Sequence, residues 1–346
     1  MTTKLCIISR KNESRVLASG DFRLEKPRKG ELEALQKSDL QLASPEECDA
    51  TLIRANPERT SGGQHRLMQR LEARAHERAI HLNPISSFQN YADKWHTFER
   101  WQAAGLATPE FMRIPIWAAF PRYAQSLAAL AEGGCYLRTS NEDSGKGLMY
   151  LPEYHQRKFR QAIRKLRWRA LLNKVSVADL LAVKRVDNRV DGLGYIYRVH
   201  MVGNTVIGGY ALCSEEEIIH SHNLSVVNLD AFLAANEQLL RFLAQPQFAN
   251  QLVEALLALK IHTAAVEFFI IGGKPIFLEV NPVWGGIHRF GREAFQAALD
   301  VREQPANIRL WLNPEGFYHE YWRQIGRLME NGGEFPLQLE LCAALT

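Results

Sequence analysis

Short apolar runs alternate with helix-like stretches in the amino-terminal part of the chain. Residues 4–9 and 50–54 are apolar enough to form buried strands, and the charged residues between them predict a loop-rich connection. Residues 64–79 are rich in Arg, Glu, Leu and Ala and contain no Gly or Pro, which favours a helix. A second helix is predicted over residues 93–104 and ends at Gly105. This alternation is typical of a small α/β domain, and we place its end at this glycine.

The middle of the chain predicts a smaller α+β unit. A Gly-Gly pair precedes a strand expected over residues 135–139, and residues 148–151 are its expected hairpin partner. Residues 153–173 predict a helix, because apolar residues recur at helical spacing on one side and basic residues occupy the other. A strand over residues 180–186 closes the unit. The basic residues of the helix are Arg157, Lys158, Arg160, Arg164, Lys165, Arg167 and Arg169.

A first antiparallel hairpin is predicted in the carboxy-terminal part. Residues 195–202 and 205–212 flank a Gly-Asn pair at 203–204, which is a two-residue turn signal. The register of such a turn sets Arg198 opposite Gly209. Since glycine has no side chain, the guanidinium has open space above the sheet and is expected to reach toward a ligand.

A second hairpin, over residues 261–281, follows helical sequence at 229–260 that is interrupted near Pro246. Both strands alternate apolar and polar residues, and their apolar sets share one core only if Val266 pairs with Val280. This register predicts a three-residue loop at 272–274. The face expected to be buried comprises Ala264, Val266, Phe268, Ile270, Ile276, Leu278 and Val280.

The same register brings two acidic side chains together. Glu267 lies opposite Glu279, with Cβ atoms about 5 Å apart, and the Asn281 amide lies beside them. A divalent cation would relieve the repulsion between the carboxylates, and this oxygen set suits Mg²⁺, or Mn²⁺, bound together with phosphate. From spacing alone an alternative stays open, in which the acids face solvent or pair with a cation such as Arg198.

The stretch Glu279-Val280-Asn281-Pro282, preceded by Glu267 and a Gly-Gly turn, resembles the metal-binding strand pair of the ATP-grasp superfamily. Members have an amino-terminal α/β domain, a central lid and a carboxy-terminal domain, with ATP between the last two. The resemblance therefore implies an α+β fold with an α/β first domain. The implied domains are residues 1–105, 106–186 and 187–346, and the implied metal ligands are Glu267, Glu279 and Asn281.

The resemblance also implies which residues bind ATP. A lysine approaches the phosphates, a lid-strand residue and a flexible loop cover them, and the backbone of a hinge strand contacts adenine. In chain order these residues are Lys94, Arg138, Ser144, Gly145, Lys146, Gly147, Lys184, Arg185 and Val186. Arg198 and Asn223 match residues near the transferred phosphate. Arg289, with Gly285 and Gly286, matches the turn beside the acceptor substrate. Taken singly, each has a structural alternative, such as a solvated charge or an ordinary hairpin loop.

The sequence departs from the superfamily pattern at three places. The phosphate-covering loop contains Glu142 and Asp143, which would repel a triphosphate unless they point outward. The hinge carries Lys184 and Arg185 where a Gln-Glu pair is common. Residues 220–223 lack the arginine found in glutathione synthase and the ribosomal-protein-modifying ligases, so that branch does not identify the substrates.

Composition limits the remaining classes of protein. With 46% hydrophobic residues, 23% charged residues and a mean hydropathy of -0.24, the 346-residue chain is expected to fold as a globular protein. No apolar run approaches the roughly 18 residues of a membrane span, so we expect a cytoplasmic protein without a membrane partner. The five cysteines lie far apart and predict buried thiols. Forty-two Lys and Arg residues against 38 Asp and Glu permit an anionic ligand without demanding nucleic acid.

These observations together predict a Mg²⁺- and ATP-dependent ligase. It would phosphorylate a carboxylate, and an amine would attack the acyl phosphate to give an amide, ADP and phosphate. A phosphotransferase acting on a hydroxyl and a non-catalytic ATP-binding regulatory module remain as alternatives. Amino acids, peptides and polyamines all remain candidate substrates. The basic helix, residues 157–169, is expected to be a solvated face but could recruit RNA or an acidic peptide, and a homodimer is open.

Overall fold

The computed structural model describes most of the chain. Its described residues are 3–9, 28–142, 147–172, 177–284 and 289–345. Five of the site residues predicted from the sequence therefore lie outside the described residues: Ser144, Gly145, Lys146, Gly285 and Gly286.

The described chain contains strands and helices throughout. The strands are β1 (Thr3–Ser9), β2 (Leu40–Leu42), β3 (Ala50–Arg54), β4 (Ile80–Leu82), β5 (Phe111–Ile114), β6 (Cys135–Thr139), β7 (Met149–Leu151), β8 (Leu180–Lys184), β9 (Arg189–Val190), β10 (Leu193–Val202), β11 (Thr205–Ser214), β12 (Thr263–Ile271), β13 (Lys274–Asn281) and β14 (Glu340–Leu341). The helices are α1 (Glu31–Gln36), α2 (Gly62–Glu72), α3 (Phe88–Ala92), α4 (Lys94–Ala103), α5 (Ala124–Leu130), α6 (Gln156–Leu172), α7 (Leu229–Leu243), α8 (Pro246–Leu259), α9 (Glu293–Asp300), α10 (Ala306–Leu312) and α11 (Pro314–Glu330).

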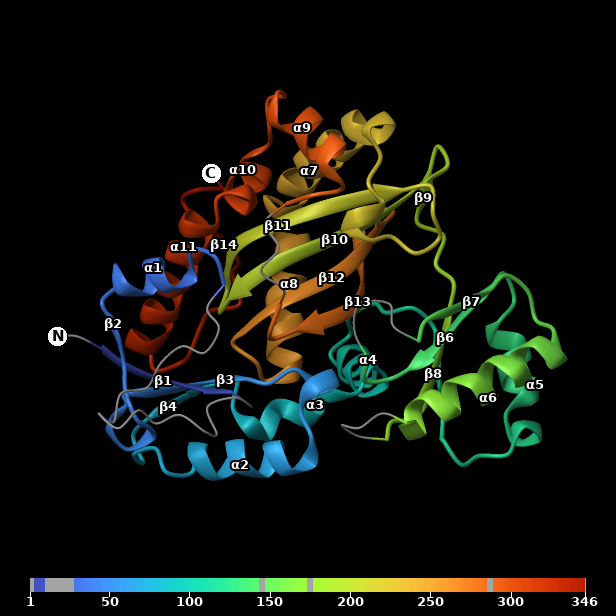
Figure 1. Cartoon of the computed structure of the whole chain (residues 1–346), viewed down its shortest axis with the longest axis horizontal. Coiled ribbons are helices and arrows are strands. Elements are labelled where there is room, and N and C mark those ends of the chain that lie inside the picture. Colours follow the sequence, from blue (N-terminus) through green and yellow to red (C-terminus); the bar gives the residue numbers. More distant parts are fainter. Residues whose placement is uncertain (1–2, 10–27, 143–146, 173–176, 285–288, 346) are drawn as a thin grey trace.

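The amino-terminal sheet has four parallel strands in the order β2-β1-β3-β4 (Figure 1). The two predicted strands at its centre are confirmed as β1 and β3. The loop-rich prediction between them was wrong in part, because α1 and β2 lie there. The predicted helix over residues 64–79 is α2, which ends seven residues early at Glu72. It begins after a capping box in which Ser61 and Gln64 satisfy each other's backbone N–H groups.

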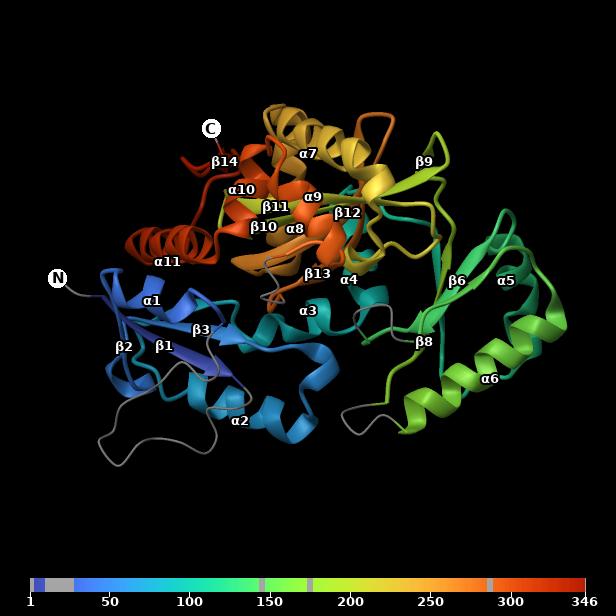
Figure 2. The same cartoon turned by 45° about the horizontal axis from the view of Figure 1, so that its top comes forward.

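The central sheet, which belongs to residues 106–186 and is called the lid here after the predicted domain, is antiparallel, in the order β5-β8-β6-β7. The predicted hairpin of β6 and β7 and the predicted basic helix, α6, are both confirmed. Phe159, Ile163 and Leu166 of α6 pack into a core that belongs to the lid alone. The cores beneath the other two sheets are continuous with each other. Figure 2 shows the lid set to one side of both.

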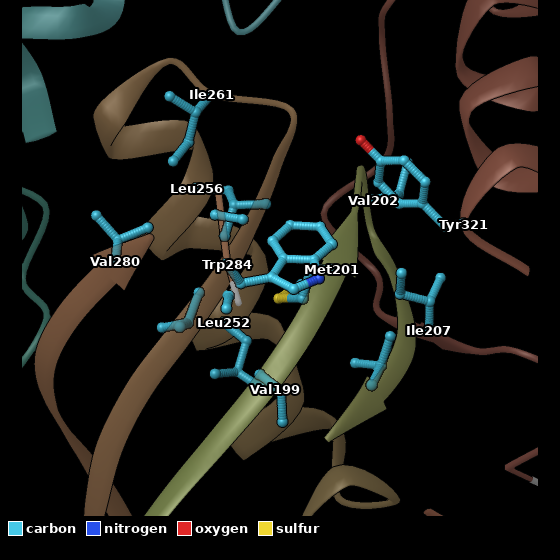
Figure 3. Close-up of a cluster of buried hydrophobic side chains, with 14 of the residues drawn as sticks. Val199, Met201, Val202, Ile207, Leu252, Leu256, Ile261, Val280, Trp284 and Tyr321 are labelled. Atoms are coloured by element: carbon cyan, nitrogen blue, oxygen red, sulfur yellow. The ribbon is translucent and has the colours of Figure 1, made fainter. Parts of the chain in front are cut away.

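The third sheet has the order β13-β12-β10-β11-β14, with β9 beside β10. The helical sequence predicted at 229–260 forms two helices, and the predicted interruption near Pro246 lies where the second, α8, begins. Figure 3 shows part of the core, to which α8 contributes Leu252 and Leu256 and the strands contribute Val199 and Val280.

The predicted boundaries after residues 105 and 186 fall between the three sheets. None of the described helices is long and apolar enough to cross a membrane. All five cysteines are buried and free, as predicted; they are Cys6, Cys48, Cys135, Cys213 and Cys342.

The acidic hairpin has the predicted register at its acids but not at its turn. Val266 pairs with Val280, and Glu267 with Glu279. The turn has two residues, not three, because Ile271 pairs with Lys274. A bulge after Glu267 absorbs the difference, so that Phe268 pairs with Phe277.

The bulge changes which side chains of β13 are buried. Phe277 is fully buried, whereas Leu278 is half-buried and lines a cavity beside Glu279. The prediction that Ile276 and Leu278 share the buried face of Val280 was therefore wrong.

The first hairpin contains a bulge as well. Its predicted two-residue turn is confirmed by the pairing of Val202 with Thr205. The register then shifts between His200 and Met201, so Arg198 lies opposite Tyr210 and not Gly209. The predicted open space above Arg198 is replaced by a tyrosine side chain.

Candidate nucleotide and metal site

A cavity of about 710 Å³ lies where the three sheets meet, and this volume suits a nucleotide-sized ligand. Most of the described site residues predicted from the sequence line it: Lys94, Arg138, Lys184, Val186, Arg198, Glu267, Glu279, Asn281 and Arg289. Three others, Gly147, Arg185 and Asn223, do not line it. Tertiary structure thus gathers residues that are almost two hundred positions apart in sequence.

Glu279 lies at the centre of the charged residues in this cavity. Its side chain is 12% exposed, and its carboxylate lies 3.6 Å from Lys94 Nζ and 3.7 Å from Arg138 Nη1. The Asn281 amide nitrogen donates to it at 3.2 Å. Burial acts to raise the pKa of Glu279, but Lys94, Arg138 and Arg198 outweigh it and hold the pKa below its ordinary value. The carboxylate is therefore ionised at neutral pH.

Glu267 forms an ion pair with Arg198, whose Nη1 also lies 3.4 Å from the Tyr210 hydroxyl. This is the cation pairing that the sequence left open as an alternative. The Nε–H groups of Arg138 and Arg198 are buried and have no hydrogen-bond partner among the described residues. Donors left over after the carboxylates are paired suit an incoming anion such as phosphate.

The donor set fits a hard divalent cation only if a ligand completes it. No group of three or more His, Cys, Asp or Glu side chains gathers anywhere in the described ranges. The candidate metal ligands are two carboxylates and one amide, from Glu267, Glu279 and Asn281. Such a partial oxygen set is typical of Mg²⁺ sites, in which nucleotide phosphates and water supply the remaining ligands.

The carbonyl oxygen of Glu142 lies between the two phosphate-binding candidates. It accepts a hydrogen bond from Lys94 Nζ at 2.9 Å and another from Arg138. The Glu142 carboxylate instead accepts from Thr139 and, at 2.7 Å, from Arg169 Nε on α6. Burial acts to raise the pKa of Glu142, but these bonds hold it below its ordinary value. Arg169 of α6 thus neutralises the Glu142 carboxylate, which therefore does not repel a bound phosphate.

Two of the three hinge residues line the cavity, and the third, Arg185, does not. Lys184 and Val186 line it, and Lys184 Nζ donates to Glu110 at 2.8 Å. Arg185 turns aside: its backbone N–H donates to Gly134, and its Nε donates to Glu217 at 2.6 Å.

Sequence reasoning missed Glu217, which lines the cavity. Its carboxylate accepts from the Tyr136 hydroxyl at 2.6 Å and from Arg185, and Arg189 Nη2 lies 3.3 Å away. Because Tyr136 belongs to the lid, these bonds tie the segment after β11 to the lid and the hinge. The only signal in the sequence is a run of three glutamates at 215–217.

Two histidines were also missed. His220 and His222 line the cavity, and their rings stack with centroids 5.1 Å apart. Burial, aided by His222, lowers the pKa of His220. Asn223 points elsewhere, because its amide nitrogen donates to Glu216 at 2.5 Å and to the Ile218 carbonyl at 3.3 Å. The His-x-His spacing was visible in the sequence.

Similarity to known proteins is confined to structure. No protein-family model matches the sequence, and no curated protein matches it. The fold matches D-alanine–D-alanine ligase from Bacillus anthracis with a TM-score of 0.52 and 10% identity, over 96% of this chain and 99% of that one. The same ligase complexed with ATP matches with a TM-score of 0.50 over the same shares. A RimK domain ATP-grasp protein from Sphaerobacter thermophilus has a TM-score of 0.48 and 14% identity, over 92% and 99% of the chains. The chain has the ATP-grasp fold, as its metal-strand motif predicted.

Proposed function

We propose that this chain is an ATP-dependent ligase that joins a carboxylate to an amine. One observation carries the proposal: Lys94 and Arg138 lie 3.6 Å and 3.7 Å from the Glu279 carboxylate in one cavity, although the three residues come from α4, β6 and β13. Their convergence is hard to explain by stability alone, since a buried ion pair contributes little after its desolvation cost.

ATP is proposed to bind with its adenine at the hinge and its phosphates near Glu279. Lys94, Arg138 and Arg198 carry three positive charges against the two carboxylates of Glu267 and Glu279, which leaves 3 − 2 = +1 for an anion. These cations hold the carboxylates until nucleotide phosphates offer them new acceptors. Glu267, Glu279 and Asn281 would hold Mg²⁺, which neutralises further phosphate charge when bound.

The protein's part in the reaction is positioning and charge stabilisation. The substrate carboxylate attacks the terminal phosphate of ATP, ADP leaves, and the amine then displaces phosphate from the acyl phosphate. Arg198 is proposed to stabilise charge on the transferred group, and Arg289, which is exposed and lines the cavity, to hold the substrate. The lid excludes water, which would otherwise hydrolyse the acyl phosphate.

The proposal is tested by ADP release with MgATP and a matrix of carboxylates and amines. We expect release to require one member of each class and to stop when EDTA removes the metal. Mass spectrometry should show a condensed product lighter than its two substrates by one water. A phosphorylated hydroxyl product would favour a phosphotransferase, and ATP binding without turnover across the whole matrix would favour a non-catalytic module.

A further inference from the structure

The cavity extends beyond the ATP-binding candidates to the amino-terminal sheet. Ser9 and Arg54 are the last residues of the parallel strands β1 and β3, and both line it. The carboxyl edge of a parallel sheet is where open α/β domains bind ligands. Arg28, just before α1, lines the same end of the cavity.

Among the described residues, two arginines at this end contact one buried acid, Arg54 through its guanidinium and Arg28 through its backbone N–H. Arg54 Nη1 lies 2.8 Å from Glu31 Oε1, with side-chain exposures of 13% and 1%. The second oxygen of Glu31 accepts the backbone N–H of Arg28 at 2.9 Å. Burial acts to lower the pKa of Arg54, but Glu31 outweighs it and holds the pKa above its ordinary value. With two guanidinium groups and one carboxylate, the cluster has a net charge of 2 − 1 = +1.

Neighbouring tyrosines do not supply the missing negative charge. Arg28 and Arg54 both act electrostatically on Tyr318 and Tyr321, so the two guanidinium groups lie in one neighbourhood. Burial nevertheless raises the pKa of Tyr321 to about 12, and that of Tyr318 lies above its ordinary value as well. Both phenols are therefore neutral near pH 7.

The nearby acid Glu58 acts electrostatically on Arg169 of α6. The hydrogen bond that Arg169 donates to Glu142 is the main reason that the pKa of Arg169 lies above its ordinary value, and Glu58 acts in the same direction. The described cavity-lining residues that precede α2 thus include three arginines, Arg28, Arg54 and Arg59, against this one acid.

A buried indole adds a donor without a partner. Trp284 lines the cavity and is 3% exposed, and its Nε1–H has no hydrogen-bond partner among the described residues. Its ring packs edge-on against Tyr321 with centroids 5.5 Å apart, and Figure 3 shows the two side chains beside each other. A buried donor without a partner is destabilising unless a ligand accepts from it.

We propose that Arg28 and Arg54 bind a carboxylate of the substrate, one that is not phosphorylated in the reaction. This inference rests on the proposed ligase function and narrows its substrate class. A planar carboxylate accepts paired hydrogen bonds from guanidinium groups, and its single charge matches the net +1 of the cluster. The same charge repels polyamines. Among the three substrate classes open from the sequence, amino acids and peptides with a free carboxyl end therefore remain.

Calorimetric titration with a panel of dipeptides and their carboxy-terminal amides tests the inference. At least one dipeptide should bind about tenfold or more tightly than its own amide, as expected for a charge-assisted pair. Arg28→Gln should remove this preference. Lys29→Gln, an exposed neighbour, should retain it. If no dipeptide binds more tightly than its amide, or if putrescine competes equally well, the inference is overturned.

Two further measurements separate the possible failures. Arg54→Gln alone would leave Glu31 buried without a partner, so Arg54→Gln is combined with Glu31→Gln, and the double variant should also lose the preference. MgATP titration should give the same affinity in wild type and Arg28→Gln. If wild type does not bind ATP or does not release ADP, the proposed function is refuted. If phosphopeptides bind more tightly than carboxylates, only the carboxylate assignment is refuted.

Discussion

At the scale of single residues, burial and neighbouring cations have opposite effects on the charge of Glu279, at the centre of the candidate site. Burial disfavours its charge, and three cations restore it. Lys94 comes from the amino-terminal domain and Arg138 from the lid, whereas Glu279 lies on β13, so these two cations hold the carboxylate only while the domains remain together. A substitution that removes the charge of Glu279 but keeps its size therefore tests the site more directly than one that removes the side chain.

Glu279→Gln is expected to lower Mg²⁺-dependent ADP release by about 100-fold or more, since an amide cannot replace a charged metal ligand. The fold should persist, because the side chain keeps its size and both Lys94 and Arg138 keep the Glu142 carbonyl as an acceptor. Circular dichroism and a coupled ADP assay measure the two effects. Glu237→Gln, on the exposed side of α7, should behave as wild type. Unchanged turnover in Glu279→Gln would refute its role at the site.

Arg138→Gln should weaken MgATP binding by about ten- to 100-fold, the effect of losing one charge-assisted hydrogen bond. Calorimetric titration of nucleotide measures this directly. Arg164→Gln removes an equal charge from the exposed face of α6 in the same lid and should leave the affinity unchanged. Equal affinities for the two variants would count against contact between Arg138 and the nucleotide.

At the scale of elements, loops and bulges decide where the polar side chains point. The bulge in β13 presents both Leu278 and Glu279 to the cavity, whereas strict alternation would turn one of them away. In the lid, Glu142 contacts Arg169 of α6 through its side chain, and Lys94 and Arg138 through its backbone carbonyl.

Gly147→Ala should disrupt this lid contact. Gly147 has φ +67°, and a Cβ there would lie 2.7 Å from Glu142 Oε2 and 2.9 Å from Arg169 Nε. We expect weaker nucleotide binding together with a loss of stability of about 1–2 kcal/mol from the left-handed backbone. Chemical unfolding and nucleotide titration measure both.

Gly133→Ala is the matched control for that variant. Gly133 also has a positive φ, +81°, but a Cβ there meets nothing within 4 Å. It should show the stability loss without the loss of nucleotide affinity. If both variants bind nucleotide equally well, the contact between Glu142 and Arg169 does not position Lys94 and Arg138.

At the scale of the whole molecule, hydrogen bonds join the amino-terminal sheet to the third sheet. The buried Asn83 accepts from the backbone N–H of His262 at 2.6 Å and of Thr263 at 3.0 Å, and donates to the Thr263 carbonyl at 2.9 Å. In return, His262 Nδ1 accepts the backbone N–H of Asn83 at 3.0 Å. The lid has no share in this junction, consistent with its separate core.

This junction predicts a loss of stability in acid. Burial lowers the pKa of His262 to about 4 from an ordinary value of 6.5, so the unfolded chain binds the proton more readily than the folded one. The stability that neutral His262 contributes is fully present above pH 6.5. It decreases as the pH falls toward 4, by about 1.4 kcal/mol per pH unit at most. Urea unfolding across this range measures the slope.

Two variants identify the group responsible. His262→Gln should flatten the slope between pH 6.5 and pH 4, because no imidazole remains to take up the proton. His319→Gln, which changes an exposed histidine on α11, should keep the wild-type slope. The assignment to His262 fails if the slope persists in the first variant.

Much of the local structure was predictable, because it depends on neighbours in sequence. Alternation in the acidic hairpin was enough to pair Glu267 with Glu279, since any other register would bury charge. Alternation was not enough to show the bulges, which depend on how Phe277 packs against the core and how Tyr210 lies over the sheet. Glu217 was missed because its partners, Tyr136 and Arg185, are distant in sequence.

By itself the sequence determined the central strands and helices and the acidic pair, because periodicity and turn chemistry act over a few residues, and the resemblance of its metal strand indicated the fold class. Only tertiary structure decided that Arg198 pairs with Glu267, that Glu142 turns toward α6, and that Arg54 pairs with the buried Glu31. The physical reason is that charge is balanced through space. Which cation neutralises which carboxylate depends on the packing of domains, and no short sequence window contains that information.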